Sequence, residues 1–327
     1  MVGQSACSSD ERLRSSLSEG IGHSAPRVRE TPGSSVAGRG PVRQVWNSDS
    51  GRYGRDDAST AREPQMYPQR NRVSSTLRDG GIALGSLTLL QEPAIGEILG
   101  AIGYDFLIID MEHAGADEQT VLTMVRACEA AGVTPLVRLR HVDEKEILWA
   151  LDTGAGGIVL PMIETADDAR AIFRLSHYPP AGDRTLCSAA RASGHGAQRH
   201  DFGKFLAWSN ESVATVCLIE TPVGLENVEA IIAEGIDVLM LGRGDLSVKL
   251  GLGYAPNHPD VLAAARDFVG RVAAAGGTAG VLAYSPEDAR EWIELGARFI
   301  VYHQPEMILA NAYRAGWDEL TALTQRG

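Results

Sequence analysis

Eight short runs of apolar residues recur along the chain from residue 70 onward, and longer amphipathic segments separate them. The runs are GIALGSLTLL (81–90), YDFLIID (104–110), TPLVRL (134–139), GGIVLPMI (156–163), VATVCLIE (213–220), IDVLMLG (236–242), TAGVLAYS (278–285) and RFIVYH (298–303). They are near-continuously apolar rather than alternating, which is typical of parallel strands that are buried on both faces.

Helical patterns lie between most of these runs. Segments 117–132 and 258–277 begin at Asp and at His-Pro and end at Gly, as helix capping favours. Eight strands that alternate with helices over about 255 residues match the count and size of a (β/α)8 TIM barrel. A doubly wound open sheet is the competing architecture, but no G-x-G-x-x-G motif follows the first strand. The predicted fold class is therefore α/β, with a (β/α)8 barrel.

The first 69 residues differ from the rest. They are rich in Ser, Gly, Arg and Asp and lack a sustained apolar period, so they cannot bury enough surface to offset the entropy lost on ordering. We expect a disordered N-terminal segment over 1–69 and a barrel domain over 70–327. The alternatives are a transit peptide, against which the acidic residues argue, and upstream sequence translated from a mistaken start, with Met66 as the true first residue.

Composition narrows the functional classes. The chain has 327 residues and a formal net charge of −12, which argues against a nucleic-acid partner because phosphate binding needs clustered Lys and Arg. No apolar run reaches the roughly 18 residues of a membrane span, and the N-terminus lacks the apolar core of a secretory signal. The four cysteines show no C-x-x-C spacing, which indicates a reduced, cytoplasmic protein.

Ionisable residues gather where the predicted strands end, which is where barrel enzymes carry their catalytic groups. Asp110, Glu112 and His113 follow the second strand, whereas Glu220 and Asp245 follow the fifth and sixth. Neighbouring strands lie about 4.8 Å apart, and two carboxylates that close repel unless a proton or cation lies between them. Oxygen ligands favour Mg²⁺, Mn²⁺ or a similar ion. The alternative is that each acid stabilises a helix N-terminus.

Two further strand ends have more than one interpretation. An arginine is expected to point into the site from the third strand, but strand parity does not separate Arg138 from Arg140, and a structural ion pair also explains a charge there. His113 beside Asp110 is a candidate acid–base dyad, in which the carboxylate orients the imidazole. The alternative is a loop histidine that takes no part in catalysis.

The segment LGRGDLS after the sixth strand contains Gly242 and Gly244. Their backbone N–H groups suit a substrate carboxylate, and the alternative is a tight turn without a ligand. An imine mechanism is disfavoured because the three lysines, Lys145, Lys204 and Lys249, lie outside the predicted barrel strands. A metal ion is therefore the expected electrophile.

These residues resemble the HpcH/HpaI aldolase family, the metal-dependent class II pyruvate aldolases typified by 4-hydroxy-2-oxoheptanedioate aldolase. The resemblance covers about residues 70–310 and lies in the order and spacing of several motifs. The motifs are FLIIDMEHAGAD, PLVRL, GIVLPMIETADDAR, YPPAGDRT, SAARAS, CLIET and LGRGDLSVKLG. The resemblance implies a barrel of the phosphoenolpyruvate/pyruvate type and a divalent cofactor (Mg²⁺, Mn²⁺ or Co²⁺). It also implies a trimer or hexamer in which the last helix packs on a neighbour.

The resemblance also implies roles for the acidic residues and the histidine. Glu220 and Asp245 match the family's metal ligands. His113 and Asp110 match its base dyad, and Glu112 matches an acid near the metal-bound water. The implied catalytic set is thus assembled from the ends of the second, fifth and sixth strands.

Other positions match the substrate contacts of the family. Arg138 matches the arginine that holds the pyruvate keto oxygen, and the backbone of Gly242–Asp245 matches the carboxylate cradle. Leu218 stands where members usually have Gln near the metal or substrate, and Arg243 replaces a usual Pro. Residues 185–187 and 301–307 also depart from the family pattern, so the acceptor aldehyde is left open.

The implied reaction is the reversible cleavage of a 4-hydroxy-2-oxo acid to pyruvate and an aldehyde, through a pyruvate enolate that the metal stabilises. The expected partners are the small 2-oxo acid and aldehyde, with no nucleic acid and no membrane. Two alternatives stand beside it. One is an enolate enzyme on the same site, either an oxaloacetate decarboxylase or a macrophomate-synthase-like enzyme, and the other is a non-catalytic binding module.

Overall fold

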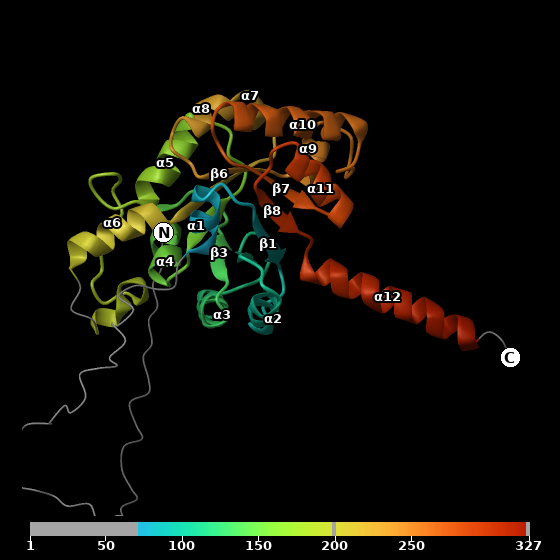
Figure 1. Cartoon of the computed structure of the whole chain (residues 1–327), viewed down its shortest axis with the longest axis horizontal. Helices are drawn as coiled ribbons and strands as arrows, with labels where there is room; N and C mark the ends of the chain where they lie inside the picture. Colours follow the sequence, from blue (N-terminus) through green and yellow to red (C-terminus); the bar gives the residue numbers. More distant parts are fainter. Residues whose placement is uncertain (1–70, 198–200, 325–327) are drawn as a thin grey trace, which may run out of the picture. The chain divides into compact units, whose positions relative to one another are not determined.

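The computed structural model describes residues 71–197 and 201–324, and in this part of the chain eight parallel strands close into one barrel (Figure 1). The strands are β1 (Ala83–Thr88), β2 (Phe106–Asp110), β3 (Thr134–Arg138), β4 (Gly157–Leu160), β5 (Ala214–Ile219), β6 (Val238–Leu241), β7 (Ala279–Ala283) and β8 (Phe299–Tyr302). Each strand lies within one predicted apolar run, and β1 pairs with β8. The predicted barrel is confirmed over the open sheet. The predicted segment 1–69 lies outside the described residues.

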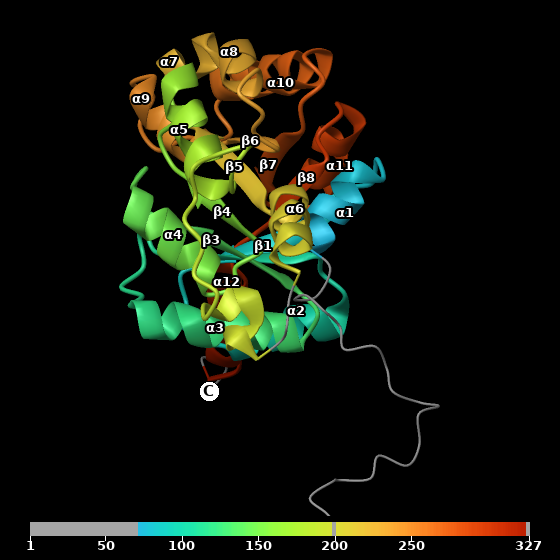
Figure 2. The same ribbon diagram turned by 90° about the vertical axis from the view of Figure 1, so that its left-hand side faces the viewer.

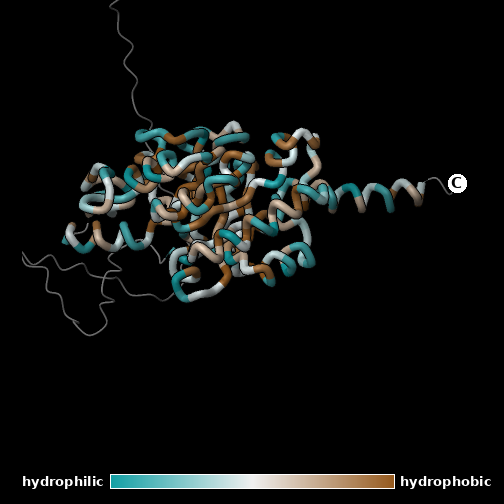
Figure 3. The backbone as a smooth tube through the Cα atoms, turned by 90° about the horizontal axis from the view of Figure 1, so that it is seen from above, coloured by the Kyte–Doolittle hydropathy of each residue, from teal (hydrophilic) through white to brown (hydrophobic). Residues whose placement is uncertain are grey.

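Successive residues of a strand face opposite sides of the barrel wall, so each apolar run contributes to two cores. Inside the barrel, Phe106 and Ile108 of β2 pack with Phe299 of β8, and the two phenyl rings stack with centroids 4.2 Å apart. Outside, Leu107 and Ile109 belong to the core shared with the helices. Figure 3 colours the backbone by the hydropathy of each residue, and the apolar residues gather at the centre of the barrel. The side that a strand residue faces therefore decides whether it reaches the barrel mouth.

Helices surround the strands (Figure 2). They are α1 (Arg72–Arg78), α2 (Ala94–Ile102), α3 (Glu118–Ala130), α4 (Glu144–Asp152), α5 (Ala166–Ser176), the 3-10 helix η1 (Arg191–Gly196), α6 (Phe202–Ser212), α7 (Pro222–Glu226), α8 (Val228–Ile232), α9 (Arg243–Lys249), α10 (Pro259–Ala274), α11 (Pro286–Glu294) and α12 (Pro305–Thr324). Asp117 accepts the Thr120 N–H before α3, and Thr165 and Asp168 form a reciprocal capping box at α5. Such caps explain why helices begin where the sequence predicts.

The N-terminal end of the barrel is covered by α1. The side-chain amide of Asn71, just before this helix, donates to the carbonyls of Gly156 and Ser212, at 2.6 and 2.5 Å. Those carbonyls lie shortly before β4 and β5. Val73 of α1 is fully buried among the residues of the barrel interior. The polar strand ends that follow lie at the opposite, C-terminal end.

The last helix, α12, differs from the others because none of its 20 residues is buried. It leaves the barrel after β8 (Figure 1). Its first turn is tied to the barrel through Glu306, whose carboxylate accepts the backbone N–H groups of Leu89 and Leu90, just after β1. Neither α12 nor another helix of the described residues is long and apolar enough to cross a membrane.

Candidate active site

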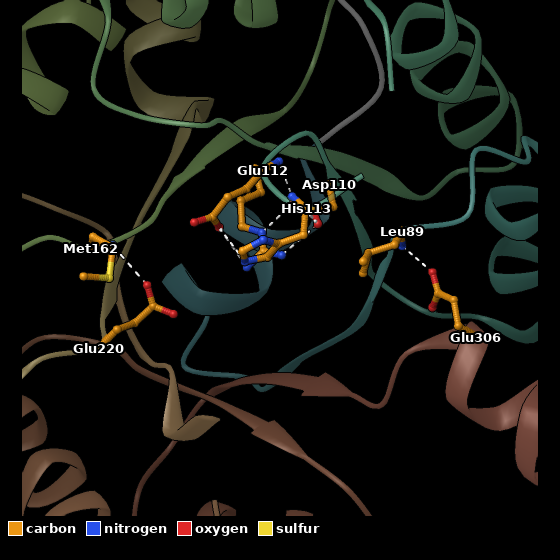
Figure 4. A network of polar contacts seen from close by, with 8 residues as sticks. Leu89, Asp110, Glu112, His113, Met162, Glu220 and Glu306 are labelled. Carbon is orange, nitrogen blue, oxygen red and sulfur yellow. Dashed lines mark hydrogen bonds and ion pairs between the residues drawn. The ribbon is translucent and has the colours of Figure 1, made fainter. Parts of the chain in front are cut away.

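Polar residues replace apolar ones where the inward faces of the strands reach the C-terminal end of the barrel. In β2, the core residue Ile108 is followed two residues later by Asp110. In β5, the core residue Leu218 is followed two residues later by Glu220, which comes directly after the strand. A period of two keeps each pair on one face of its strand. Figure 4 shows these acids with Glu112 and His113 at the barrel mouth.

Asp110 and Arg138 form a buried ion pair across two neighbouring strands. The register of β2 and β3 places the two residues side by side. Arg138 Nε and Nη2 donate to Asp110 Oδ1 and Oδ2, both at 2.8 Å. Arg140 instead forms an exposed pair with Glu146 at 3.2 Å. Of the two arginines that the sequence leaves open, Arg138 is therefore the one that points into the site.

Arg138 stays charged in spite of its burial. Burial alone lowers its pKa, but the hydrogen bond and charge of Asp110 and the charges of Glu112 and Glu220 outweigh that effect and raise the pKa. Two guanidinium nitrogens bind Asp110, and the third, Nη1, lies 3.2 Å from Glu112 Oε2. The guanidinium is therefore held in a fixed plane, and Nη1, which pairs with Glu112, is the nitrogen that Asp110 does not occupy.

The predicted pairing of the His113 imidazole with Asp110 is not formed. The two Asp110 oxygens accept Arg138 and the backbone N–H groups of Glu112 and His113, at 2.9 and 3.2 Å. Within the described residues the imidazole pairs with Glu112 instead, with 3.7 Å between Nε2 and Oε2. The register of β2 and β3 explains this arrangement, because it places the Asp110 carboxylate beside Arg138. The His113 side chain is 58% exposed, so a ligand can reach it.

Glu112 Oε2 is buried and accepts no hydrogen bond from the residues described, although it forms ion pairs with Arg138 Nη1 at 3.2 Å and His113 Nε2 at 3.7 Å. The pKa of Glu112 is raised, chiefly by burial. The charges of Arg138 and His113 oppose this rise, and those of Asp110 and Asp245 add to it. A buried acceptor without a donor is costly unless a ligand or water bonds it. Glu112 Oε2 can therefore accept a hydrogen bond from a bound group or a water at the mouth.

Glu220 is a buried acid at the end of β5, with 4% of its surface exposed. Its Oε2 accepts the Met162 N–H at 3.1 Å, across from the end of β4 (Figure 4). Burial raises its pKa to about 7; the Met162 hydrogen bond and the Arg138 charge oppose this, while the charges of Asp245 and Glu112 add to it. Strongly shifted acids of this kind are typical of functional sites.

Gly242, after β6, provides the space for Glu220. A Cβ at this position would lie 2.4 Å from Glu220 Oε1 and 2.6 Å from its Cγ, so a larger residue would displace the acid. Gly244 lies against the exposed Tyr254 ring, where a Cβ would meet the ring at 3.1 Å. The sequence predicts the Gly242 N–H as a donor to a substrate, but in the structure this N–H donates to the Ile219 carbonyl at 2.9 Å, so the reason for a glycine there is steric.

The helix-cap explanation fails for Glu220 but not for Asp245. Thr221, not Glu220, caps α7, because its side chain accepts the Gly224 N–H. Asp245 lies in the first turn of α9 and is exposed, so the helix terminus does favour its charge. That charge also raises the pKa of Glu220 and of Glu112. Asp245 thus interacts electrostatically with both acids at the mouth.

The donor set fits a divalent cation. Within the ranges described, no three His, Cys, Asp or Glu side chains form a ready-made metal site. The candidate is a pair of carboxylates, Glu220 and Asp245, which leaves positions for water and substrate oxygens, as Mg²⁺ prefers. The negative charges of Glu220 and Asp245 repel each other, and Glu112 adds a third carboxylate whose Oε2 accepts no hydrogen bond from the residues described. A bound cation would relieve this repulsion.

Comparison with known proteins decides the family. A family model described as HpcH/HpaI aldolase/citrate lyase matches residues 60–304. This chain belongs to the HpcH/HpaI aldolase family. It is 37% identical over 237 residues to a 4-hydroxy-2-oxovalerate aldolase of Novosphingobium aromaticivorans, over 72% of this chain and 88% of the relative. It is 34% identical over 248 residues to a 4-hydroxy-2-oxo-heptane-1,7-dioate aldolase of Salmonella paratyphi C, over 75% and 93% of the two chains.

Solved structures agree with this assignment. An HpcH/HpaI aldolase/citrate lyase family protein of Burkholderia cenocepacia matches with a TM-score of 0.71 and 33% identity, over 77% of this chain and 99% of that one. Macrophomate synthase matches with a TM-score of 0.70 and 25% identity, over 80% and 92%. The resemblance stated from the motifs is confirmed, and so is the class of carbon–carbon lyases at the level of the HpcH/HpaI family.

Other predicted features of this HpcH/HpaI family chain can now be placed. Leu218 lies inside the barrel with 4% of its surface exposed, so it offers an apolar contact below Glu220. Lys145 and Lys204 have side chains that are 75% and 72% exposed, and Lys249 is exposed too. None of the three lysines therefore has the desolvated surroundings that imine formation needs.

Two features of the mouth were not predicted from the sequence. Met162 binds Glu220 through its backbone N–H and has a φ of 57°, which is unusual for a residue other than glycine and occurs often at functional sites. Glu306 fixes the chain after β1, next to His303, whose φ is 56°. A backbone donor has no signal in the sequence. The departure of residues 301–307 from the family pattern was the one signal near the second feature, and it led to no prediction for Glu306 or His303.

Proposed function

We propose that this chain is a divalent-metal-dependent aldolase that reversibly cleaves a 4-hydroxy-2-oxo acid into pyruvate and an aldehyde. The observation that carries the proposal is the buried acid Glu220, with a pKa near 7, in electrostatic contact with the buried Arg138 and with Asp245 at the barrel mouth. Two relatives at 34–37% identity are named as aldolases of 4-hydroxy-2-oxo acids, which supports this substrate class.

Arg138 and the turn after β6 bind the 2-oxo acid. Glu220 and Asp245 would hold the divalent ion (Mg²⁺, Mn²⁺ or Co²⁺), which supplies Lewis acidity at the keto oxygen when bound. Arg138 Nη1 donates to that oxygen and stabilises the negative charge that develops on it. Because Asp110 holds the other two nitrogens, the guanidinium needs little reorganisation. The N–H groups of residues 243–245, in the first turn of α9, bind the carboxylate, whereas the Gly242 N–H donates to the Ile219 carbonyl at 2.9 Å.

His113 moves the proton. Its exposed imidazole accepts the proton of the C4 hydroxyl, the C3–C4 bond breaks, and the electron pair of that bond passes into the enolate of pyruvate while the aldehyde leaves. The imidazolium then returns the proton to C3. Glu112, 3.7 Å from Nε2, stabilises the imidazolium between these steps. Leu218 provides the apolar floor against which the substrate chain packs.

Replacing His113 with alanine is expected to reduce aldol cleavage about 10²–10⁴-fold, the usual contribution of general acid–base catalysis. The measurement is pyruvate release from a 4-hydroxy-2-oxo acid, with Mg²⁺, Mn²⁺ or Co²⁺ and with a chelator. His258→Ala is the matched control, because this histidine also lies beside a carboxylate, Asp260 at 3.6 Å, but at the start of α10 rather than after β2. Full activity of His113→Ala, or activity unaffected by chelator, would contradict the proposal.

The alternative is decarboxylation of oxaloacetate on the same site. It needs the same enolate but no base for a hydroxyl group, and the likeness to macrophomate synthase is the observation that favours it. His113→Ala separates the two functions. A decarboxylase should keep its turnover of oxaloacetate in this variant, whereas an aldolase should lose its cleavage of the hydroxy acid.

We also propose that α12 packs on a second copy of the chain in a trimer or hexamer. The helix has no buried residue, and it exposes seven large apolar side chains: Met307, Ile308, Leu309, Tyr313, Trp317, Leu320 and Leu323. A surface helix normally buries one apolar stripe, and exposed apolar patches of this kind mark interaction sites. A neighbouring copy is the occupant that the family resemblance implies.

The double substitution Trp317→Glu with Leu320→Glu should therefore lower the oligomeric state. These side chains are 67% and 62% exposed in the single chain, so the change removes no contact within it. Sedimentation equilibrium measures the mass, and Leu295→Glu, an exposed leucine outside α12, is the control. An unchanged mass of the double variant would show that α12 makes no contact between copies.

A further inference from the structure

The turn that carries Asp245 is fastened to β7 and α11 by the buried side chain of Arg243. We propose that Arg243 is a positioning residue: its guanidinium fixes the Gly242–Asp245 turn and thereby the place of the Asp245 carboxylate. The inference rests on the proposed function, because it takes Asp245 as a metal ligand. Among the described residues, the side chain of Arg243 bonds to Asn257, Leu282 and Asp288 and not to Arg138 or Glu220, so it acts through the backbone that it anchors.

Three polar contacts hold the guanidinium. Nη2 donates to the Leu282 carbonyl in β7 and to Asp288 Oδ2 in α11, both at 2.8 Å. Nη1 donates to Asn257 Oδ1 at 3.3 Å, in the loop before α10. The Arg243 side chain is only 2% exposed. One charged group therefore joins the start of α9 to a strand, a helix and a loop that are distant in the sequence.

Aromatic rings and a shared acid complete the anchor. The guanidinium carbon lies 5.1 Å from the ring centroids of Tyr284 and of Trp292. Asp288, which binds Arg243, also accepts the Trp292 indole N–H at 2.6 Å and the Tyr284 backbone N–H at 2.9 Å. Desolvated arginine–carboxylate contacts of this kind lose much energy when one partner is removed. The anchor is thus more rigid than a surface ion pair.

Asp245 depends on this anchor because little else holds it. In the ranges described, no hydrogen bond or ion pair fixes its exposed carboxylate, so the backbone of α9 decides where the carboxylate lies. A helix of seven residues is marginal by itself and relies on tertiary contacts. Arg243 is its first residue, two positions before Asp245. A loose anchor would let the acid move by the ångström or so that metal binding does not tolerate.

A purely structural role is the competing explanation, and the chain offers a matched control for it. Arg184 is likewise buried, with a side chain 3% exposed, an ion pair to Asp152 Oδ1 at 2.8 Å, and the Tyr178 ring centroid 4.5 Å from its guanidinium carbon. Asp152 is the last residue of α4, on the N-terminal side of the barrel. Arg184 therefore resembles Arg243 in chemistry but not in position.

The experiment measures Mn²⁺ binding to metal-free protein by calorimetry, without substrate, together with thermal unfolding. The variants are Arg243→Met, Arg243→Lys and Arg184→Met. Both methionine variants should unfold at lower temperature. Arg243→Met should weaken Mn²⁺ binding at least tenfold, Arg243→Lys should recover part of that loss, and Arg184→Met should bind within twofold of wild type. Asp288→Asn is the milder second variant if Arg243→Met does not fold, and it should weaken Mn²⁺ binding severalfold.

The outcomes separate this inference from the proposed function. Mn²⁺ binding that is unchanged in Arg243→Met and in Asp288→Asn, or equally weakened in Arg184→Met, would overturn the positioning role and leave the metal site intact. Failure of the wild-type protein to bind Mn²⁺, Mg²⁺ or Co²⁺ would overturn the proposed function, and the inference with it. Mn²⁺ binding that is weakened in the Arg243 variants but not in Arg184→Met would support both the metal site and the positioning role of Arg243.

Discussion

Replacing Glu220 with glutamine is expected to stabilise the metal-free protein at alkaline pH while removing its metal binding and aldolase activity. Burial, together with the charges of Asp245 and Glu112, raises the pKa of Glu220 from 4.5 to about 7. Because the folded-state pKa lies above the unfolded one, the contribution of the neutral acid is complete below pH 4.5 and is lost as the pH rises through 7. A shift of this size corresponds to about 3 kcal/mol.

Glutamine cannot ionise, and its side-chain oxygen can still accept the Met162 N–H, so the variant avoids this loss. Urea unfolding in the presence of a chelator measures the effect at two pH values. At about pH 8.5 the free energy of unfolding of Glu220→Gln should exceed that of the wild type by up to about 3 kcal/mol, and at about pH 4.5 the two should be similar. Calorimetry should show that the variant no longer binds Mn²⁺.

Glu229→Gln is the control for this experiment. The hydrogen bond from Arg271 lowers the pKa of Glu229 to about 2. The ionised Glu229 therefore stabilises the fold above its unfolded-state pKa, which is the opposite of the effect at Glu220. This variant should gain no stability at alkaline pH and should bind Mn²⁺ normally. The metal-ligand role of Glu220 is wrong if Glu220→Gln binds Mn²⁺ as tightly as wild type or is less stable than wild type at pH 8.5.

The strands and many helix starts are local features, and this is why the sequence predicts them. In β2, Phe106 and Ile108 fill the barrel while Leu107 and Ile109 meet the helices, so burial on both faces produces one continuous apolar run. Helix starts have local signals too, such as Asp117, which caps α3 by accepting an N–H three residues later. Neither feature depends on a contact that is distant in the sequence.

The partners of the site residues are not local, and there the prediction was incomplete. Asp110 and His113 are neighbours in the sequence, yet the register of β2 and β3 gives the Asp110 carboxylate to Arg138, which is 28 positions away. Met162 donates a backbone N–H to Glu220 across 58 positions, and such a donor is present in nearly any residue type. Residue types at strand ends were therefore predictable, whereas the pairing between them required the closed barrel.

The pairing of Asp110 with Arg138 leads to the second large effect. Asp110→Asn should weaken both folding and substrate binding, because it removes the charge of the carboxylate that accepts two hydrogen bonds from the buried guanidinium of Arg138. Breaking a buried ion pair by removing one partner costs about 3–5 kcal/mol. The side chains here are 0% and 9% exposed, so solvent cannot compensate. With Arg138 no longer held in its plane, binding of pyruvate, or of oxalate as an enolate mimic, should fall about 100-fold.

A double-mutant cycle distinguishes this role of Asp110 from the base dyad. If Asp110 acts by holding Arg138, then Asp110→Asn and Arg138→Met should be strongly non-additive in oxalate affinity, with a coupling free energy above about 1 kcal/mol. Asp110→Asn and His113→Ala should be additive within about 0.5 kcal/mol. The control is Asp152→Asn, which breaks the similar pair with Arg184 away from the mouth and should lower stability without changing oxalate affinity. Strong coupling of Asp110 to His113, with none to Arg138, would instead restore the dyad and remove Asp110 as the residue that orients the arginine.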